Sequence, residues 1–274
     1  MSGHDLLARA LAACGREGWT GALRVSGSPG GVLHLRHGLI VAAESPGAPG
    51  PEALLLRSGR VDGEQWAALV REGGGARWPA AGLVARGYAG AAQLAVVCVV
   101  ALQDAVFAIL AGRVEGCERV DAGVEPPAPV AVGEPCARLL EDAARKLTAL
   151  SALPHPVHPD RERPLPVPDS TAPLSELRRD LLAHADGRRT ARDLAFRTGR
   201  GVYTVTVEVS RMLTEGLLRC PSEPAPIAVR VPPEGIHGRT PPAPAPPPPE
   251  PPGPATLPRR RQNGFFRLRN GSPK

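Results

Sequence analysis

Three short segments near the N-terminus decide the fold class: Trp19-Thr-Gly-Ala-Leu-Arg-Val25, Val32-Leu-His-Leu-Arg-His37 and Leu39-Ile-Val-Ala-Ala-Glu44. The first two alternate apolar and polar side chains, as a strand with one buried face does. Glycines in residues 26–31 and at position 38 separate the segments, and glycine permits the tight reversals of hairpins. The pattern predicts an antiparallel β-meander, with Leu33 and Leu35 on one face of its second strand and His34 on the other.

Apolar residues at helical spacing predict helices around this meander. We expect them at residues 4–17, 51–57, 63 to about 71, and 88–110, with a closing strand at 113–120. Pro51 occupies a first turn, where proline is tolerated, and Asp62 is placed to cap the third helix. Gly112 ends the long apolar helix. The predicted fold class of residues 1–123 is therefore α+β: a small antiparallel β-meander with packed helices.

Residues 124–173 are predicted to be a linker that contains one amphipathic helix at 136–153. Leu139, Ala143, Leu147 and Leu150 share one face of this helix. Seven prolines follow within residues 154–173, a composition typical of a stiff, extended and solvated spacer.

Residues 174–220 are predicted to form a second compact unit of three helices and a strand. Thr190 can cap its second helix with Asp193 as a capping-box partner, and Gly199 can end that helix. The valines at 205, 207 and 209 also alternate as a strand would, but a third helix is needed to cover the first two. Three short helices followed by a strand are the outline of a small winged-helix (helix-turn-helix) unit.

The C-terminal tail, residues 221–274, holds 17 of the 33 prolines and is predicted to be disordered, because such a composition cannot bury a core. The net charge of +6 equals the six basic residues of 259–274, where no acid occurs. The remaining basic and acidic side chains balance at 27 each. The basicity that would suggest nucleic acid therefore belongs to the tail, which could also meet an acidic protein or an anionic membrane.

We expect a cytoplasmic protein without a membrane span. The longest charge-free apolar stretch, residues 87–103, is shorter than the roughly 20 residues that a span needs. The N-terminus carries Asp5 and Arg9 and lacks the apolar run of a secretory signal. The five cysteines are at least 19 residues apart, so no Cys-x-x-Cys pair exists.

The chain is predicted not to be an enzyme, and we expect no catalytic residue, cofactor site or metal site. Glycines 27–31 lie between two strands, so no helix N-terminus follows to hold a phosphate. His34 and His37 are expected on opposite faces of a strand, and His155 and His158 in the solvated spacer, which makes metal binding the minor alternative at both. Hydrolysis of GTP or ATP by the purified protein would support the alternative that the chain is an enzyme.

The arginine and hydroxyl side chains of residues 174–220 are the candidates for contact with DNA or with a protein. The unit has nine arginines against six acids, but the third helix has only Arg211 against Glu208 and Glu215. Phosphate affinity comes from Lys and Arg, so this helix is a poor recognition helix. The candidate contact residues are Arg188, Arg189, Arg192, Arg197, Arg200, Thr204, Thr206 and Arg211.

Two parts of the chain resemble known bacterial modules. The strand and hairpin motifs Trp19-Thr-Gly-Ala-Leu-x-Val and Leu33-x-Leu-x-x-Gly38-x-Ile40-x-x-Ala43, with Ala53-Leu54, resemble the PATAN-type bacterial domain. Residues 185–195 and Leu213-x-x-Gly-Leu217 are similar to the winged-helix segment often joined to it. The glycine-rich loop at 27–31 is longer than that pattern has.

The resemblance implies a non-catalytic regulatory protein, of the kind associated with small Ras-like GTPases, roadblock-type proteins and response regulators. Our leading hypothesis is a cytoplasmic adaptor. Its N-terminal domain would bind a protein partner, possible partners being a small Ras-like GTPase or a roadblock-type protein, and the winged-helix unit would pass the signal to transcription. The alternative is a transcriptional regulator that binds DNA directly.

Overall fold

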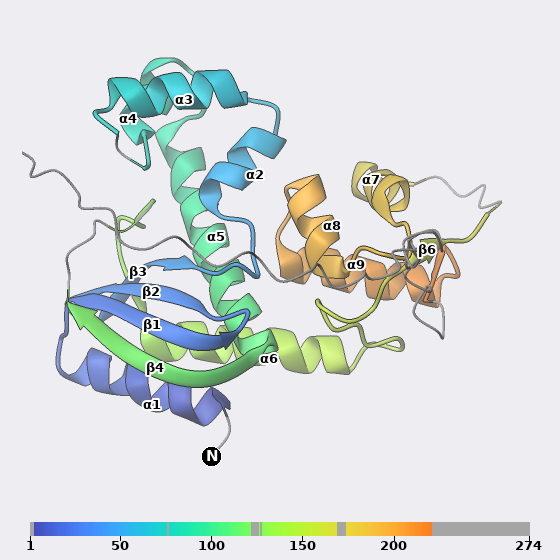
Figure 1. Cartoon of the computed structure of the whole chain (residues 1–274), viewed down its shortest axis with the longest axis horizontal. Coiled ribbons are helices and arrows are strands. Elements are labelled where there is room, and N and C mark those ends of the chain that lie inside the picture. Colours follow the sequence, from blue (N-terminus) through green and yellow to red (C-terminus); the bar gives the residue numbers. More distant parts are fainter. Residues whose placement is uncertain (1–2, 76, 122–125, 127, 169–173, 221–274) are drawn as a thin grey trace, which may run out of the picture. The chain divides into compact units, whose positions relative to one another are not determined.

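Five strands form one antiparallel sheet in the computed structural model, which describes residues 3–75, 77–121, 126, 128–168 and 174–220 (Figure 1). The strand order is β4-β1-β2-β3-β5. Their bounds are Gly21–Ser28 (β1), Gly31–Arg36 (β2), Leu39–Glu44 (β3), Arg113–Asp121 (β4) and Glu134–Pro135 (β5). The predicted α+β class, the meander and the closing strand are confirmed, and the closing strand, β4, pairs with β1 at the sheet edge.

The expected faces of β2 are confirmed: Leu33 and Leu35 belong to the main core, whereas His34 lines a groove together with Arg24 and Arg36. Leu33, His34 and Leu35 are all buried, with 0%, 6% and 3% of their surfaces exposed. The register between β2 and β3 shifts between His34 and Leu35, where β3 carries one extra residue, Val41. The buried His34 ring contacts Glu44 of β3, with 3.1 Å between Nε2 and Oε1.

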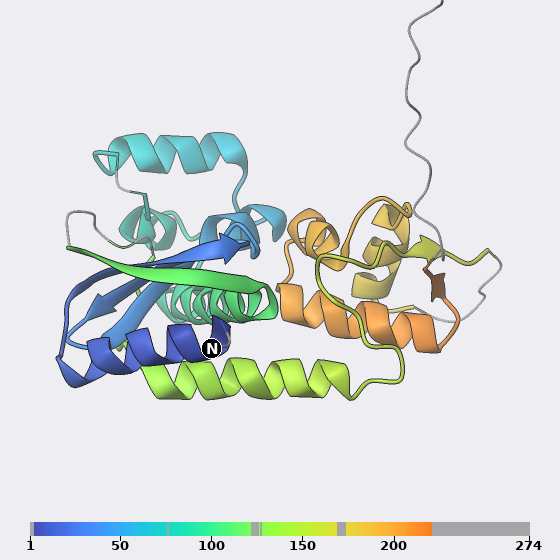
Figure 2. The same ribbon diagram turned by 60° about the horizontal axis from the view of Figure 1, so that its bottom comes forward.

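Helices cover one face of the sheet. α1 (Gly3–Arg16) and α6 (Cys136–Ser151) lie side by side beneath the strands (Figure 1, Figure 2). Leu7 and Leu11 of α1 pack with Leu139 of α6 and Leu33 of β2 in one buried cluster. Leucine, valine and alanine dominate this core, and Phe107 is its one fully buried aromatic side chain among the described residues.

A second, smaller core lies in a lobe of helices between β3 and β4. The lobe comprises α2 (Pro51–Arg57), α3 (Gly63–Glu72), α4 (Ala80–Ala85) and the long α5 (Ala91–Ala111). Leu55, Trp66, Leu69 and Leu83 are its buried centre. The predicted cap is confirmed: the Gln65 amide donates to Asp62 Oδ1 at 2.8 Å in a capping box. The sequence analysis missed α4, which has only six residues.

The three helices expected downstream are α7 (Glu176–His184), α8 (Ala191–Thr198) and α9 (Val202–Thr214), followed by β7 (Leu218–Arg219). The helical alternative for the third segment is confirmed, since Val205 and Val209 are fully buried on one helix face. The capping box of Thr190 and Asp193 is also present.

The predicted spacer is wrong for the described residues 154–168. Its strand β6 (Leu165–Pro166) pairs with β7, and Val157 is buried. Proline lacks an N–H but keeps its carbonyl: Pro164 O accepts from the Gly187 amide at 3.0 Å. Upstream, residues 126–135 were also expected to be linker, but the Val130 amide donates to Val41 O and β5 extends the sheet.

The described residues up to Cys220 belong to one compact unit. The predicted disordered tail, 221–274, lies outside the described residues, as do parts of the predicted linker. Within the described part, α5 alone is long and apolar enough to cross a membrane, but 56% of its most apolar 18-residue window is buried inside the protein.

Candidate functional site

A cleft of about 970 Å³ opens where β1 turns into β2. Its walls are the β1–β2 turn, the segment that joins β3 to α2, the indoles of α3 and its following loop, and one side of α5. The residues that line the cleft include Arg24, Gly30, Glu44, Ser45, Gly50, Glu52, Trp66, Arg77, Trp78, Ala101 and Ala105. The volume falls within the range of pockets that hold ligands or partner side chains.

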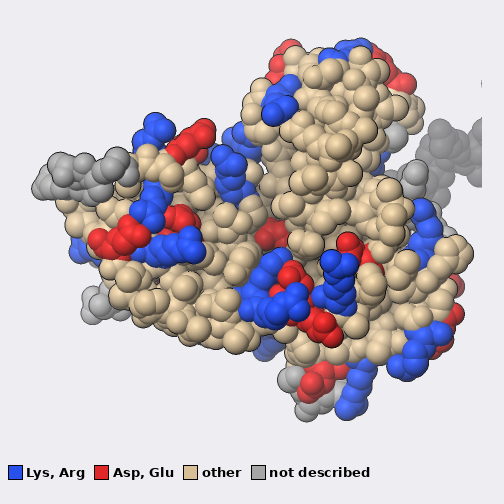
Figure 3. Space-filling view, turned by 180° about the vertical axis from the view of Figure 1, so that it is seen from behind, with Lys and Arg blue, Asp and Glu red and all other residues tan. Residues whose placement is uncertain are grey.

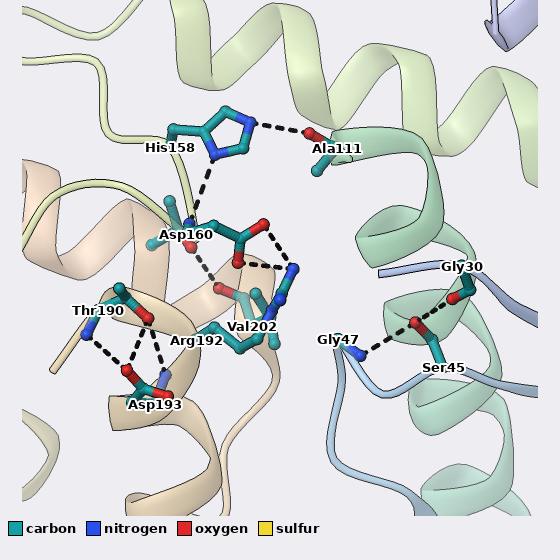
Figure 4. Close-up of polar contacts among 11 residues, drawn as sticks. Gly30, Ser45, Gly47, Ala111, His158, Asp160, Thr190, Arg192, Asp193 and Val202 are labelled. Carbon is teal, nitrogen blue, oxygen red and sulfur yellow. Dashed lines mark hydrogen bonds and ion pairs between the residues drawn. The ribbon is translucent and has the colours of Figure 1, made fainter. Parts of the chain in front are cut away.

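The turn at the cleft rim is held by Ser45. Its hydroxyl donates to Gly30 O at 2.7 Å and accepts from the Gly47 amide at 3.1 Å (Figure 4). Gly30 has φ +65°, which favours glycine, and a Cβ at Gly31 would lie 2.3 Å from Glu44 O. The glycine-rich segment is thus a hairpin turn, as expected, and its close backbone packing explains the glycines.

Glu44 and Arg77, which line the cleft, belong to a charged cluster that also includes His34. The Glu44 carboxylate accepts from Arg77 Nη2 at 2.7 Å and lies 3.1 Å from His34 Nε2. The hydrogen bond with His34, followed by that from Arg77, holds the pKa of Glu44 below its ordinary value. His34 therefore pairs with the Glu44 carboxylate. Among the described residues, no group of three or more His, Cys, Asp or Glu side chains comes together as a metal site would need.

A buried carboxylate connects this half of the molecule to the three C-terminal helices. Asp104 of α5 is 6% exposed and accepts from the backbone amides of Val202, at 2.6 Å, and Tyr203, at 3.1 Å. It thereby caps α9, whose own N-cap residue, Gly201, has no side chain to do so. Burial raises the pKa of Asp104, against the lowering effect of the two amide bonds. The sequence analysis missed this role, although Asp104 is the one charged residue of a long apolar helix.

The segment before β6 makes two further contacts near the end of α5. His158 Nε2 donates to Ala111 O at 2.8 Å, and Arg192 Nη2 lies 2.6 Å from both oxygens of Asp160 (Figure 4). The expectation that His158 is solvated is therefore wrong. Together with Asp104, these contacts join α8 and α9 to α5.

The eight candidate contact residues of the C-terminal helices divide into three groups. Five are exposed: Arg188, Arg197, Arg200, Thr204 and Arg211. Two are half-buried and paired, Arg189 with Asp186 and Arg192 with Asp160.

Thr206 requires a correction. It is fully buried, and its hydroxyl donates to Val202 O at 2.7 Å. Its position one turn into α9 places it on the face that packs against the core. It is not available for contact with DNA or a partner.

Two arginines outside that set also matter. Arg57, at the end of α2, packs closely against Gly199, where an added Cβ would clash with the Arg57 side chain. Arg178 of α7 bonds Glu208 at 2.5 Å and Glu215 at 2.6 Å, so the acids of α9 are occupied within the unit. No sequence signal pointed to either pairing, since both join residues at least 30 positions apart.

Comparison of the chain with family models, with curated proteins and with solved structures finds no match.

Proposed function

We propose that this chain is a non-catalytic, cytoplasmic regulatory adaptor of PATAN type. The N-terminal α+β part binds a signalling protein in the cleft beside the β1–β2 turn. The three-helix part, which we take to be a winged-helix unit, passes the signal on and thereby acts in transcriptional control.

The observation that carries this proposal is the placement of Asp104. Ala101 and Ala105 line the cleft, and Asp104, on the same turn of α5, caps α9. A partner that presses on Ala101 and Ala105 acts on the helix that holds the cap. Binding at the cleft can therefore change how firmly the start of α9 is held, which is the coupling that an adaptor needs.

The chemistry of the cleft fits a protein partner. Most of its exposed lining is apolar, and its charged side chains include both signs, in Arg24, Glu44, Glu52 and Arg77. Two large indoles, Trp66 and Trp78, lie 5.9 Å apart between ring centres at its inner side. Aromatic anchors with a polar rim are typical of protein interfaces. The partner class, a small Ras-like GTPase or a roadblock-type protein, follows from the resemblance.

Direct binding of DNA is the second candidate, supported by the exposed Arg188, Arg197 and Arg200. A helix-turn-helix presents the N-terminal residues of its recognition helix to the bases. Here Val202 is fully buried, and the Tyr203 ring packs edge-on against Phe107, with ring centres 5.3 Å apart. These contacts favour a helical unit that meets a protein over one that reads bases.

The test is titration of the full chain with small Ras-like GTPases, loaded with GDP or a GTP analogue, and with roadblock-type proteins of the same organism. We expect one of them to bind the wild type, and R24E combined with E52R to weaken binding at least about tenfold, because both changes reverse charges at the cleft. Glu141→Arg, on the exposed face of α6, is the control and should bind as the wild type.

Failure of every such protein to bind, or equal binding by the double variant, would contradict the proposal. A salt-dependent shift of duplex DNA that is lost in R197A/R200A would favour the DNA-binding alternative instead.

A further inference from the structure

A second groove, of about 500 Å³, lies between α4 and the first half of α5. Every described residue that lines it is uncharged, and the lining includes Trp78, Val84, Leu94, Ala95, Cys98 and Ala131. It is distinct from the cleft of the proposed function: of the described lining residues, the two share only Trp78.

Exposed apolar side chains gather around this groove. Of the six large apolar residues that are exposed in the described part of the chain, Phe196 alone belongs to the C-terminal helices. The other five lie on α4, on the first half of α5, or at the β3–β5 edge next to Ala131: Leu39, Val84, Val96, Val100 and Val132. Val96 is 61% exposed and Val132 81%. Exposed apolar side chains beside an apolar groove are typical of an interaction site.

We propose that this face binds a second copy of the chain in a two-fold symmetric dimer. Ala92, Val96 and Val100 follow one another at intervals of four and form an exposed ridge along α5. The groove runs along the adjacent side of the same helix, past Ala95. Helices pack ridge into groove, and a two-fold rotation puts the ridge of each copy into the groove of the other.

The charges around the groove also fit a second copy. Arg86 and Glu72 form an ion pair of 2.6 Å directly after α4, and Glu134 and Arg138 approach to 3.9 Å after Val132. Charges of both signs are therefore present at the rim of the groove. A second copy of the chain would not face a surface of one sign that repels it. A membrane surface would instead favour a rim rich in Lys and Arg. Figure 3 shows charges of both signs on the α3–α4 lobe and a wide charge-free area below it.

Sedimentation of the full chain from about 1 to about 100 µM tests the proposal, since interfaces of ordinary size dissociate at micromolar or lower concentrations. We expect a species of twice the 28.6 kDa chain mass that dissociates on dilution. Val96→Glu and Val96→Lys should each be monomeric, because the dimer would bury two like charges close to its axis. An equimolar mixture of the two should restore the dimer.

Thr204→Glu adds the same charge on the exposed face of α9 and should leave the dimer intact. Because Val96 is exposed in the single chain, circular dichroism should show both Val96 variants folded. A wild type that stays monomeric, variants that still dimerise, or a mixture that stays monomeric would overturn the proposal. So would a monomeric wild type that co-sediments with anionic lipid vesicles, which would assign the face to lipid. None of these outcomes depends on a partner in the cleft.

Discussion

The two halves of α5 have similar composition but differ in burial, since only Leu94 and Cys98 are buried in the first half. In residues 91–100, Val96 and Val100 are 61% and 42% exposed, whereas in residues 101–111 Phe107 and Ile109 are almost fully buried. Only the buried half carries a charge, Asp104, and this carboxylate holds the start of α9. Hydropathy alone does not distinguish the two halves of α5. One continuous apolar helix thus forms core at one end and exposes apolar side chains at the other, on the face that we propose binds a second copy.

A matched pair of substitutions should separate the halves most strongly. Val106→Ser removes fully buried methyl groups and should lower the free energy of unfolding by about 3 kcal/mol, whereas Val100→Ser should lower it by less than about 0.5 kcal/mol. Denaturant unfolding at about 1 µM, where the proposed dimer dissociates, measures both. Equal losses in the two variants would show that the halves do not differ as described.

Asp104→Ala should have the next largest effect. It leaves the amides of Val202 and Tyr203 without an acceptor inside the protein, which should cost about 2 kcal/mol of unfolding free energy. The control is Asp142→Ala on α6, which removes surface ion pairs with Arg145 and Lys146 and should cost less than about 1 kcal/mol. A loss no greater than that of the control would mean that the cap does not stabilise the fold.

The pH dependence of stability should show a smaller effect. Burial raises the pKa of Asp104, so the folded protein binds this proton more tightly than the unfolded chain. The wild type should therefore lose part of its stability as the pH rises from the ordinary value of the carboxyl, 3.8, through the raised pKa. Asp104→Asn has no such proton, and the difference in stability between the two proteins should change across that window. A constant difference would contradict the raised pKa.

Local patterns predicted many elements well. The caps at Asp62 and Thr190, the meander around Gly38 and the three helices of 174–220 all follow from side chains within a few residues of each other. Such signals act through short-range hydrogen bonds and periodicity, which a single sequence displays directly.

The long-range arrangement was not predictable in the same way. Asp104 and Val202 are 98 positions apart, and nothing in either segment points to the other. The proline count made residues 154–168 look like a spacer, but composition does not reveal that Asp160 meets Arg192. Thr206 was proposed as a contact because of its hydroxyl, and its burial depends on which face of α9 packs inward. The cleft likewise combines the β1–β2 turn with α5, which no local motif encodes.

Amide hydrogen exchange in Asp104→Ala tests the central claim, that α5 holds the start of α9, most directly. We expect the Val202 and Tyr203 amides to be protected in the wild type and to exchange at least about tenfold faster in the variant, relative to the Leu23 amide of β1 as an internal reference. Unchanged protection at Val202 and Tyr203, relative to Leu23, would contradict the claim.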